Sequence, residues 1–456
     1  MLGQARPRHL AQFAPPPSGQ HGRPLRCPVD PGAGTLEFLR KAWNNRTDSW
    51  MESESQVREF NITAIFGGIG GLELGLHKAG HTTSLFCERD PDAVSVLASR
   101  FPSVPIALDI RHTAEVIERI SPKSDLLTAG FPCTDLSQAG TTLGFAGGRS
   151  SLIRETIELL RRRPFGNVLI ENVPNWRHLH GGEYLREVIE ALEGLGYHWA
   201  YRTLDVRAFG LPQRRLRLFL FATMEGDPRD ALFHGDSNTE EQPFRLNEAA
   251  HGFYWTEGTR GLGWGENCVP TLKGGSAIGI PAPPAILMPN MSIITPDIVD
   301  GERLQGLPAN WTNLSERAGV VGAGKFNRRK RWTLVGNAVN VEVSAWIGKR
   351  LKDRKSFRDA PGSILFEPHS WPAAAWFDGK FRYRVELGPC PVKRKRKALA
   401  DFLSIPGAPL SLRATAGFYK RIEASSLLFK PGFVAAIRKH FRQMERATMV
   451  PSKRAA

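Results

Sequence analysis

A cysteine directly after a proline lies in the loop "GFPCTDLSQAG" (130–140). The run "SDLLTA" just before this loop is typical of a buried strand. A free cysteine is most often a small buried hydrophobe. A reactive thiol instead needs a turn, where the backbone and solvent can shape its pKa. The strand-end position, Pro132 and the bracketing glycines favour a nucleophilic role for Cys133.

Polar residues end a second predicted strand, "NVLIENV", at Glu171 and Asn172. A buried strand has no packing reason to end in a carboxylate, and a helix cap or a surface charge is the alternative interpretation. The segment "PQRRLRLFLFA" begins another strand with Arg215 and Arg217. We expect these arginines to converge on the same edge of the sheet, with an ordinary basic strand edge as the alternative.

A thiol, a carboxyl group and a guanidinium together suit chemistry on a pyrimidine ring. Ring atom C5 is inert until a nucleophile adds at C6, and a thiolate is a strong nucleophile for that addition. A carboxyl group can hydrogen-bond the ring N3 and the exocyclic amine, while an arginine can hold the ring carbonyl. A nearby methyl sulfonium could then alkylate C5.

A glycine-rich loop, "FGGIGG", follows the first β-branched run, "NITAIF", and precedes a helical pattern. Ligands of an open α/β sheet bind at the carboxyl ends of its strands, which is where this loop lies. The three glycines that would let the backbone approach a ligand are Gly68, Gly70 and Gly71. The loop departs from the dinucleotide fingerprint, because Glu73 occupies the position of its third glycine.

Acidic residues follow the next two predicted strands. Glu88 comes directly after Cys87, in the place of an acid that accepts hydrogen bonds from ribose hydroxyls, and Asp109 follows "VPIAL". Together with the glycine loop, these two acids indicate a cofactor that contains adenosine. Five scattered cysteines without a CxxC pair predict neither a zinc site nor a disulfide framework, so we expect no metal.

The positive charge of the chain is concentrated near its end. The 456 residues carry a formal net charge of +16, and residues 352–456 hold 22 Lys and Arg against 8 Asp and Glu. A basic extension of this kind is typical of proteins that bind a polyanion such as nucleic acid, and a solvated charged tail is the alternative. We find no run of 18 apolar residues and no secretory signal, so we expect a cytoplasmic protein.

Strands that alternate with helical patterns up to Ala222 predict a doubly wound α/β fold with a mainly parallel sheet. After Ala222 the composition becomes rich in Gly, Pro, Asn and Trp, and no hydrophobic periodicity is sustained. The predicted parts are a disordered segment (1–57), a catalytic and cofactor-binding domain (58–224), a target-recognition insert (225–293), a return segment (294–351) and a basic extension (352–456).

Seven motifs in order give the chain its resemblance to a known family. "FGGIGG", "CERD", "GFPC", "ENV", "PQRRLR", "RLQGLP" and "GNAV" resemble the motifs of the DNA (cytosine-5) methyltransferases over roughly residues 60–351. The resemblance implies the Rossmann-like fold of methyltransferases that use S-adenosylmethionine. Thr134, Leu307 and Asp297 depart from the residues that many members carry.

The resemblance also implies roles for particular residues. Cys133 would be the nucleophile, Glu171 the acid that binds cytosine, and Arg217 the arginine closest to the base, with Arg215 beside it. The residues expected to bind S-adenosylmethionine are Phe66, Gly68, Gly70, Gly71, Glu88, Asp109, Ile110, Pro132, Asn337 and Val339.

The insert is expected to read DNA. It carries Arg245, Arg260 and Lys273, which can reach bases or phosphates, and we expect Gln305 from the "RLQGLP" motif to contact DNA too. Its two tryptophans, Trp255 and Trp264, could also contact DNA, or they could form the small core of the insert. The run "VKRKRK" could bind phosphates, act as a nuclear signal in a eukaryotic host, or remain flexible and solvated.

The implied reaction is methyl transfer to a cytosine flipped out of double-stranded DNA at a short specific site. Cys133 would add to C6, and loss of the C5 proton and of the thiolate would follow methylation. We expect a monomeric bacterial enzyme without membrane contact, associated with the nucleoid through its DNA. A restriction endonuclease would be its companion in a restriction–modification system.

Three alternatives remain open. The first is an RNA cytosine-5 methyltransferase on the same scaffold, although the chain lacks the Cys-Phe-Thr signature of such relatives. The second is a DNA-binding protein that has lost catalysis, which the intact set of Cys133, Glu171 and Arg217 disfavours. The third is an NAD-dependent oxidoreductase, which the missing third glycine of the fingerprint disfavours.

Overall fold

The computed structural model describes residues 58–131, 151–237, 243–276, 283–314, 326–353, 357, 362–364 and 371–449. Two predictions lie outside these residues: the disorder of residues 1–57, and the nucleophile loop with Pro132 and Cys133. Among the described residues, none of the helices combines the length and the apolar character that a membrane span requires.

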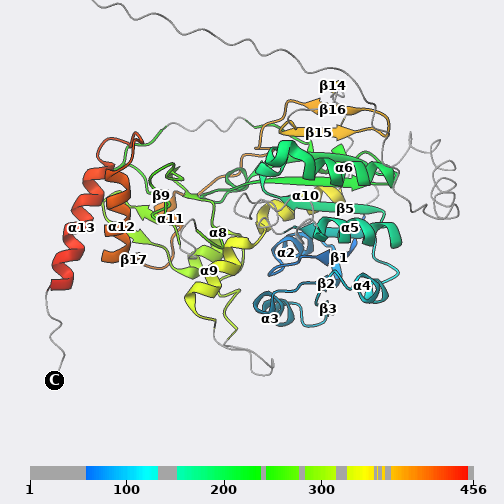
Figure 1. Cartoon of the computed structure of the whole chain (residues 1–456), viewed down its shortest axis with the longest axis horizontal. Coiled ribbons are helices and arrows are strands. Elements are labelled where there is room, and N and C mark those ends of the chain that lie inside the picture. The colour runs from blue at the N-terminus through cyan, green and yellow to red at the C-terminus, as the bar shows by residue number, and fades with distance from the viewer. Residues whose placement is uncertain are drawn as a thin grey trace, which may run out of the picture. The chain divides into compact units, whose positions relative to one another are not determined.

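A ten-stranded sheet forms the centre of the catalytic part, in the order β14-β16-β15-β6-β8-β5-β4-β1-β2-β3 (Figure 1). Its strands are β1 (Asn61–Ile65), β2 (Thr82–Cys87), β3 (Ile106–Ala107), β4 (Leu126–Gly130), β5 (Asn167–Asn172), β6 (His198–Asp205), β8 (Leu216–Thr223), β14 (Ser363–Ile364), β15 (Ala374–Phe377) and β16 (Arg382–Val385). Strands β3, β2, β1, β4 and β5 are parallel neighbours, so their carboxyl ends meet at one edge.

The other half of the sheet is antiparallel. Strand β8 runs antiparallel to both β5 and β6, and β15 pairs antiparallel with β6 and β16. The sheet is therefore mixed, and the prediction of a mainly parallel sheet is wrong beyond β5. Strands β14–β16 come from the predicted basic extension. Of these, β15 pairs with β6, which lies about 170 residues earlier in the chain.

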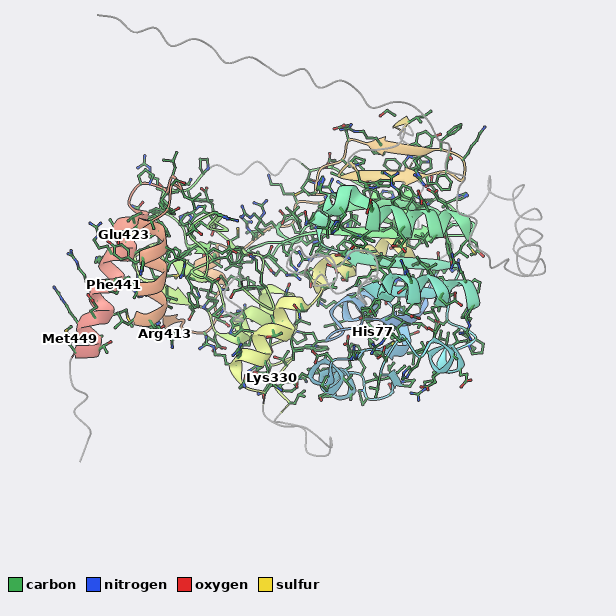
Figure 2. The ribbon with its side chains drawn as sticks, in the orientation of Figure 1. His77, Lys330, Arg413, Glu423, Phe441 and Met449 are labelled. Carbon is green, nitrogen blue, oxygen red and sulfur yellow. The ribbon has the colours of Figure 1, made fainter. Side chains whose placement is uncertain are left out.

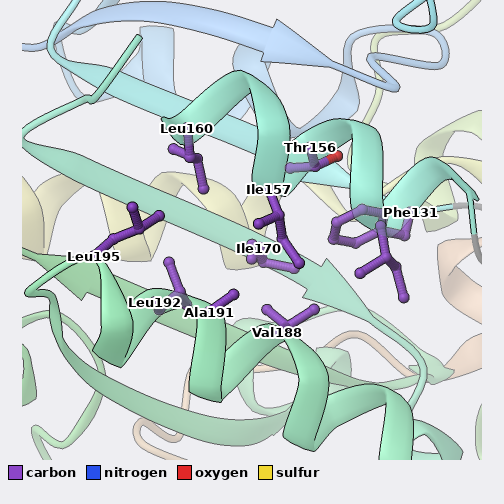
Figure 3. Close-up of a pocket in the computed structure, with 10 residues that line it drawn as sticks. Phe131, Thr156, Ile157, Leu160, Ile170, Val188, Ala191, Leu192 and Leu195 are labelled. Atoms are coloured by element: carbon purple, nitrogen blue, oxygen red, sulfur yellow. The ribbon is translucent and has the colours of Figure 1, made fainter. Parts of the chain in front are cut away.

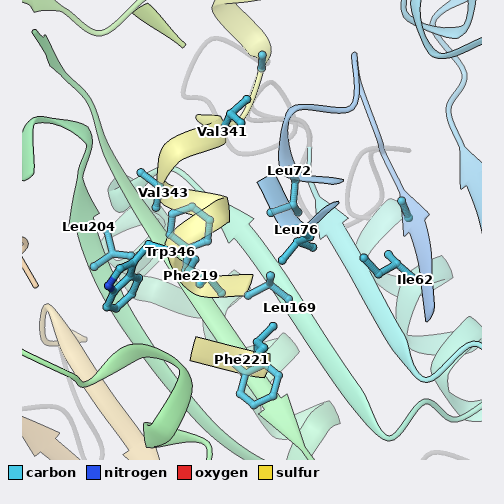
Figure 4. Packing of buried hydrophobic residues seen from close by; sticks show 14 of the residues in the cluster. Ile62, Leu72, Leu76, Leu169, Leu204, Phe219, Phe221, Val341, Val343 and Trp346 are labelled. Atoms are coloured by element: carbon cyan, nitrogen blue, oxygen red, sulfur yellow. The ribbon is translucent and has the colours of Figure 1, made fainter. Parts of the chain in front are cut away.

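Helices cover both faces of this sheet. Successive strand residues point to opposite faces, so neighbouring residues of one strand are buried in different cores. Leu126 packs in one core and Leu127 in the other. One core lies under α2 (Gly71–Lys78), α3 (Pro91–Arg100), α7 (Arg229–Leu232) and α10 (Val341–Lys352). The other lies under α4 (Thr113–Arg119), α5 (Ser151–Arg162) and α6 (Glu183–Gly194). Figure 4 shows the first core, where Leu72, Leu76 and Trp346 lie over the sheet.

A second, five-stranded sheet has the order β10-β9-β12-β13-β17. Its strands are β9 (His251–Phe253), β10 (Gly265–Glu266), β12 (Ala285–Leu287), β13 (Ile293–Thr295) and β17 (Ala408–Pro409). The first four come from the predicted recognition insert or its border, and β17 comes from the predicted basic extension. Two helices of that extension, α12 (Leu412–Glu423) and α13 (Phe433–Met449), share a core with this sheet.

Two 3-10 helices, η3 (Pro174–Arg177) and η4 (Leu179–Gly182), lie between β5 and α6. The remaining short elements are β7 (Gln213–Arg214), β11 (Val269–Pro270), α8 (Ile298–Leu304), α9 (Arg328–Asn337), α11 (Leu399–Phe402) and the 3-10 helix η5 (Val206–Phe209). Strand β7 pairs parallel with β11. The run "VKRKRK" packs along η5, where the Arg394 amide donates to the Ala208 carbonyl over 3.0 Å. The structure thus differs from the picture of a free solvated run.

Candidate active site

The carboxyl ends of the parallel strands come together as the sequence predicts. Ile65 at the end of β1 lies opposite both Cys87 of β2 and Ala129 of β4. Gly130, the last residue of β4, lies opposite Glu171 of β5. The segments that follow these strands therefore start from a common edge, which is where open α/β sheets bind their ligands.

Gly130 is the point where three predicted site segments meet. From the position that a Cβ would take at Gly130, the Phe66 carbonyl oxygen is 3.6 Å away. The Glu171 Oε2 and Val339 Cγ2 atoms are each 3.9 Å away. Cys133 follows Gly130 by three residues, and a span of three residues reaches at most about 11 Å between Cα atoms.

Glu171 is an almost fully buried carboxyl group beside an arginine. Its side chain is 9% exposed, and Arg217 Nε lies 2.9 Å from its Oε1. Burial raises the pKa of Glu171 above its usual value, while the charges of Arg217 and Arg215 oppose that rise. Because Phe219 of β8 pairs with Glu171, the start of β8 brings Arg217 to the same edge.

Arg215 occupies the interior rather than the open edge. It is 1% exposed, and its guanidinium donates to the carbonyl oxygens of Leu272 (2.8 Å), Gly336 (3.2 Å) and Ala338 (2.8 Å). These bonds join the start of β8 to the recognition insert and to the return segment. The structure therefore brings Arg217, but not the Arg215 guanidinium, into contact with Glu171.

The glycine loop has the backbone geometry that its composition predicts. Phe66, Gly68 and Gly70 have φ values of 55°, 55° and 76°, in the left-handed region that glycine adopts most easily. A methyl group at Gly71 would overlap the Val339 carbonyl oxygen, so this close contact requires glycine. A methyl group at Gly68 would meet nothing within 4 Å, so the loop faces open space there.

Glu88 is tied to the glycine loop. Its carboxylate accepts hydrogen bonds from the amides of Gly68, Arg89 and Asp90, each at 2.8 Å. Burial raises the pKa of Glu88, and the three amide donors partly offset that rise. The end of β2 thereby fixes the loop after β1, and the acid borders the open space beside Gly68.

The segment after β3 combines an ionised acid with an exposed apolar side chain. Hydrogen bonds from the Arg111 guanidinium hold the pKa of Asp109 at about 2. The preceding Leu108 is 63% exposed, although its neighbours Ala107 and Ile110 are buried. An exposed leucine between buried residues at this edge offers an apolar surface to a ligand.

The start of the nucleophile loop is anchored in the core. The Phe131 ring lies 5.3 Å from the Phe66 ring and 6.2 Å from the Trp176 ring, centre to centre. Phe131 also lines an apolar cavity of about 10 Å³ between α5 and α6, with Ile170 and Val188 among its walls (Figure 3). This volume is at the lower limit for one water molecule, so the cavity is a packing gap and not a ligand site.

The return segment closes the site from the far end of the chain. Asn337 at the end of α9 is exposed, and Val339 is half-buried between Gly71 and Gly130. A methyl group at Gly274 of the insert would overlap the Asn337 side chain. The predicted cofactor residues at 337 and 339 thus contact both the glycine loop and the insert.

The predicted DNA contacts divide into exposed and buried residues. Arg245 and Arg260 are exposed, and Lys273 pairs with Glu257 at 2.7 Å. Gln305 is fully buried, and its amide donates to the Val335 carbonyl over 2.8 Å. The insert tryptophans pack in its core: Trp264 stacks on His251 and contacts Phe433, and Trp255 donates to the Pro283 carbonyl.

One residue of the site region escaped the sequence analysis. Glu73, noted there only as the place of a missing glycine, is 1% exposed and accepts a hydrogen bond from Thr128 of β4 over 2.8 Å. It lies in the first turn of α2, among the buried positions Leu72 and Leu76. Its place on the apolar side of a helical pattern was the signal that could have revealed it.

Comparison with known proteins is consistent with this geometry. The model of the C-5 cytosine-specific DNA methylase family matches residues 60–254. The Type II methyltransferase M2.BsuMI of Bacillus subtilis (strain 168) is 44% identical over 370 residues, which cover 79% of this chain and 92% of the relative. The Type II methyltransferase M.Bsp6I of Bacillus sp. (strain RFL6) is 35% identical over 162 residues, covering 35% of this chain and 50% of the relative.

Among solved structures, the S. pombe Dnmt2 methyltransferase aligns with 63% of this chain and 97% of its own, at a TM-score of 0.44 and 15% identity. The match to the Bacillus subtilis relative extends well past the residues of the family model, into the insert and the extension. The chain thus belongs to the C-5 cytosine-specific DNA methylase family, and it is a DNA (cytosine-5) methyltransferase.

Proposed function

We propose that the chain transfers the methyl group of S-adenosylmethionine to C5 of a flipped cytosine at a short specific site in double-stranded DNA. The observation that carries this proposal is the meeting of Phe66, Glu171 and Val339 around Gly130, three residues before Cys133. In this proposal the cofactor-binding loop, the cytosine-binding acid and the nucleophile loop surround one site at the carboxyl edge of the sheet.

The residues at this edge fit S-adenosylmethionine. The loop has open space beside Gly68, a half-buried carboxyl group at Glu88, and the exposed side chain of Leu108 for an adenine ring. We infer that Phe66, Gly68, Gly70, Gly71, Glu88, Asp109, Ile110, Pro132, Asn337 and Val339 hold the cofactor. When bound, it supplies an electrophilic methyl group on a sulfonium.

Glu171 fits the Watson–Crick edge of cytosine. Burial favours its neutral form, and a neutral carboxyl group has one donor for N3 and one acceptor for the exocyclic amine. Donation to N3 would withdraw electrons from the ring and help addition at C6. Arg217 beside it would hold the orientation of the carboxyl group and reach the ring carbonyl.

The proposed covalent step runs through Cys133. Its thiolate forms a bond to C6, C5 then takes the methyl group, a base removes the C5 proton, and expulsion of the thiolate restores the aromatic ring. Flipping the base costs a few kcal/mol, which stacking and hydrogen bonds in the pocket offset. In this scheme Arg215 positions the surrounding segments, since its Nη1 and Nη2 groups already donate to backbone carbonyls.

The chain's biological setting follows from its relatives. Both Bacillus relatives are named Type II methyltransferases, so we propose that this chain is a bacterial cytoplasmic enzyme of a restriction–modification system. A companion endonuclease would cut the same site when it is unmethylated. The domain division at residues 225 and 294, a monomeric state and the DNA contacts of Arg245, Arg260 and Lys273 remain part of this proposal. The predicted DNA contact of Gln305 is dropped, because its side chain is fully buried.

Expression in a bacterial host that lacks 5-methylcytosine tests the function. Bisulfite sequencing should reveal methylation at one short sequence with the wild-type chain and none with Cys133→Ser. The purified serine variant should still bind S-adenosylmethionine in calorimetry, which separates lost chemistry from lost folding. Methylation by the serine variant at the wild-type level would refute the nucleophile, and methyl transfer to RNA but not to duplex DNA would refute the substrate.

A further inference from the structure

The C-terminal helices are built into the second sheet. Strand β17 pairs with β13 and so adds a fifth strand to this sheet. The Phe253 ring of β9 lies 5.3 Å from the Phe418 ring of α12 and 5.2 Å from the Phe433 ring of α13. We call α12, α13 and their connection (412–449) the C-terminal hairpin. Its inner face completes the core of the sheet.

Polar contacts fix the hairpin to the insert. The Arg421 guanidinium donates to the carbonyl oxygens of Trp255 (2.7 Å) and Glu257 (2.9 Å). Lys430 forms an ion pair with Glu266 of β10. Aromatic packing together with these bonds holds the helices in one orientation on the sheet, so their outer face has a fixed direction.

The outer face of α13 is strongly basic. Phe433, Ala436, Ile437 and His440 are buried on its inner face. Arg438, Arg442 and Arg446 are exposed and recur every four residues, so they form one row with a rise of about 6 Å between neighbours. Figure 2 shows the hairpin side chains, with Arg413 on α12 and Phe441 and Met449 on α13 labelled.

Few acidic groups balance this row. Residues 412–449 contain eight Lys and Arg but only two acids, Glu423 and Glu445. Among the described residues, Arg442 and Arg446 have no ion-pair partner, and Arg438 donates to the Tyr419 hydroxyl. Like charges four residues apart destabilise a helix by roughly 0.2–0.5 kcal/mol per pair. The row therefore weakens α13 unless a polyanion neutralises it.

We propose that the row of Arg438, Arg442 and Arg446 binds the phosphates of DNA that flanks the methylated site. This inference rests on the proposed duplex substrate, and it gives the C-terminal hairpin a role that the catalytic motifs do not cover. The insert would read bases, while the hairpin fixed to its sheet would add sequence-independent phosphate contacts beyond them. The DNA-binding surface then has two parts, the insert and the C-terminal hairpin of the basic extension.

Salt-dependent binding to unspecific duplexes tests the row, because phosphate contacts do not depend on sequence. The variant carries Arg438→Gln, Arg442→Gln and Arg446→Gln in the otherwise complete chain. The matched control carries Lys123→Gln, Arg161→Gln and Arg162→Gln, three exposed cations at the amino-end edge of the main sheet, opposite the site. Both keep the buried residues, and thermal unfolding checks their folding.

Fluorescence anisotropy of a labelled 40-base-pair duplex gives the slope of log affinity against log salt. Loss of three phosphate contacts should reduce that slope by about 2.7, at about 0.9 per contact, and the control should keep the wild-type slope. On a duplex of about 12 base pairs centred on the sequence that the enzyme methylates, too short for flanking contacts, variant and wild type should bind alike.

Either of two results overturns the inference: an unchanged slope on the long duplex, or an equal loss on the short one. If the wild-type chain methylates DNA and the variant keeps the wild-type salt slope of affinity, this inference is wrong and the proposed function stands. If the wild-type chain binds no duplex at all, the proposed function is wrong.

Discussion

Glu73→Gln should make the protein more stable at high pH. Glu73 is buried under the start of α2, and burial raises its pKa from 4.5 to about 7, although the Thr128 hydroxyl donates to it. Among the described residues its Oε2 atom has no hydrogen-bond partner, so the charged form lacks compensation. Glutamine retains the shape and an acceptor for Thr128 but never ionises.

The magnitude follows from proton linkage. The folded chain holds the Glu73 proton more tightly than the unfolded chain, so the contribution of Glu73 to stability is most favourable below pH 4.5 and declines as the pH rises towards 7. A rise of about 2.5 pKa units corresponds to about 3 kcal/mol lost above pH 7, at 1.36 kcal/mol per unit. That is a large part of the roughly 5–15 kcal/mol that keeps an ordinary protein folded.

Urea unfolding at pH 5, 6, 7 and 8 measures the effect. The stability difference between Glu73→Gln and wild type should be small near pH 5 and grow to about 3 kcal/mol in favour of the variant near pH 8. Glu190→Gln, at an exposed position on α6, should show no such growth. A difference that stays constant with pH, or a wild type that is more stable at pH 8, would contradict the burial of an ionisable carboxyl group.

Three further substitutions probe the site and its support. Gly71→Ala should weaken S-adenosylmethionine binding at least tenfold in calorimetry, because its methyl group must displace the Val339 carbonyl; wild-type affinity would contradict the close contact. Phe433→Ala should lower the free energy of unfolding by about 3–5 kcal/mol, as expected for a large aromatic removed from a core; a loss below 1 kcal/mol would mean that the hairpin is not part of that core. Arg217→Gln should move the pH–rate profile to higher pH, because the Glu171 pKa rises further without the neighbouring positive charge; an unshifted profile with wild-type kcat would refute the pairing.

The parallel half of the fold is visible in the sequence because each strand is a short apolar run followed by a functional loop. Glu88, Asp109 and Glu171 stand at strand ends, and the rule that parallel strands share a carboxyl edge brings them together. No local sequence pattern predicts β15 or β17. Each pairs with a strand more than 100 residues away, and both lie in a basic segment whose composition suggests a tail.

Side-chain direction is the other quantity that composition does not reveal. Arg215 and Arg217 are two residues apart in one motif, yet the first binds backbone carbonyls in the interior and the second faces Glu171. The interruption between β7 and β8 falls at Arg215, which separates their environments. Gln305 is a similar case, since a polar residue in a loop motif is buried by contacts that depend on α9.

The contact between Gly71 and Val339 joins the beginning and the end of the catalytic machinery. During synthesis, Gly71 is made about 270 residues before Val339, and the insert is made in between. A growing chain therefore cannot form this contact until the whole insert, residues 225–293, has been synthesised.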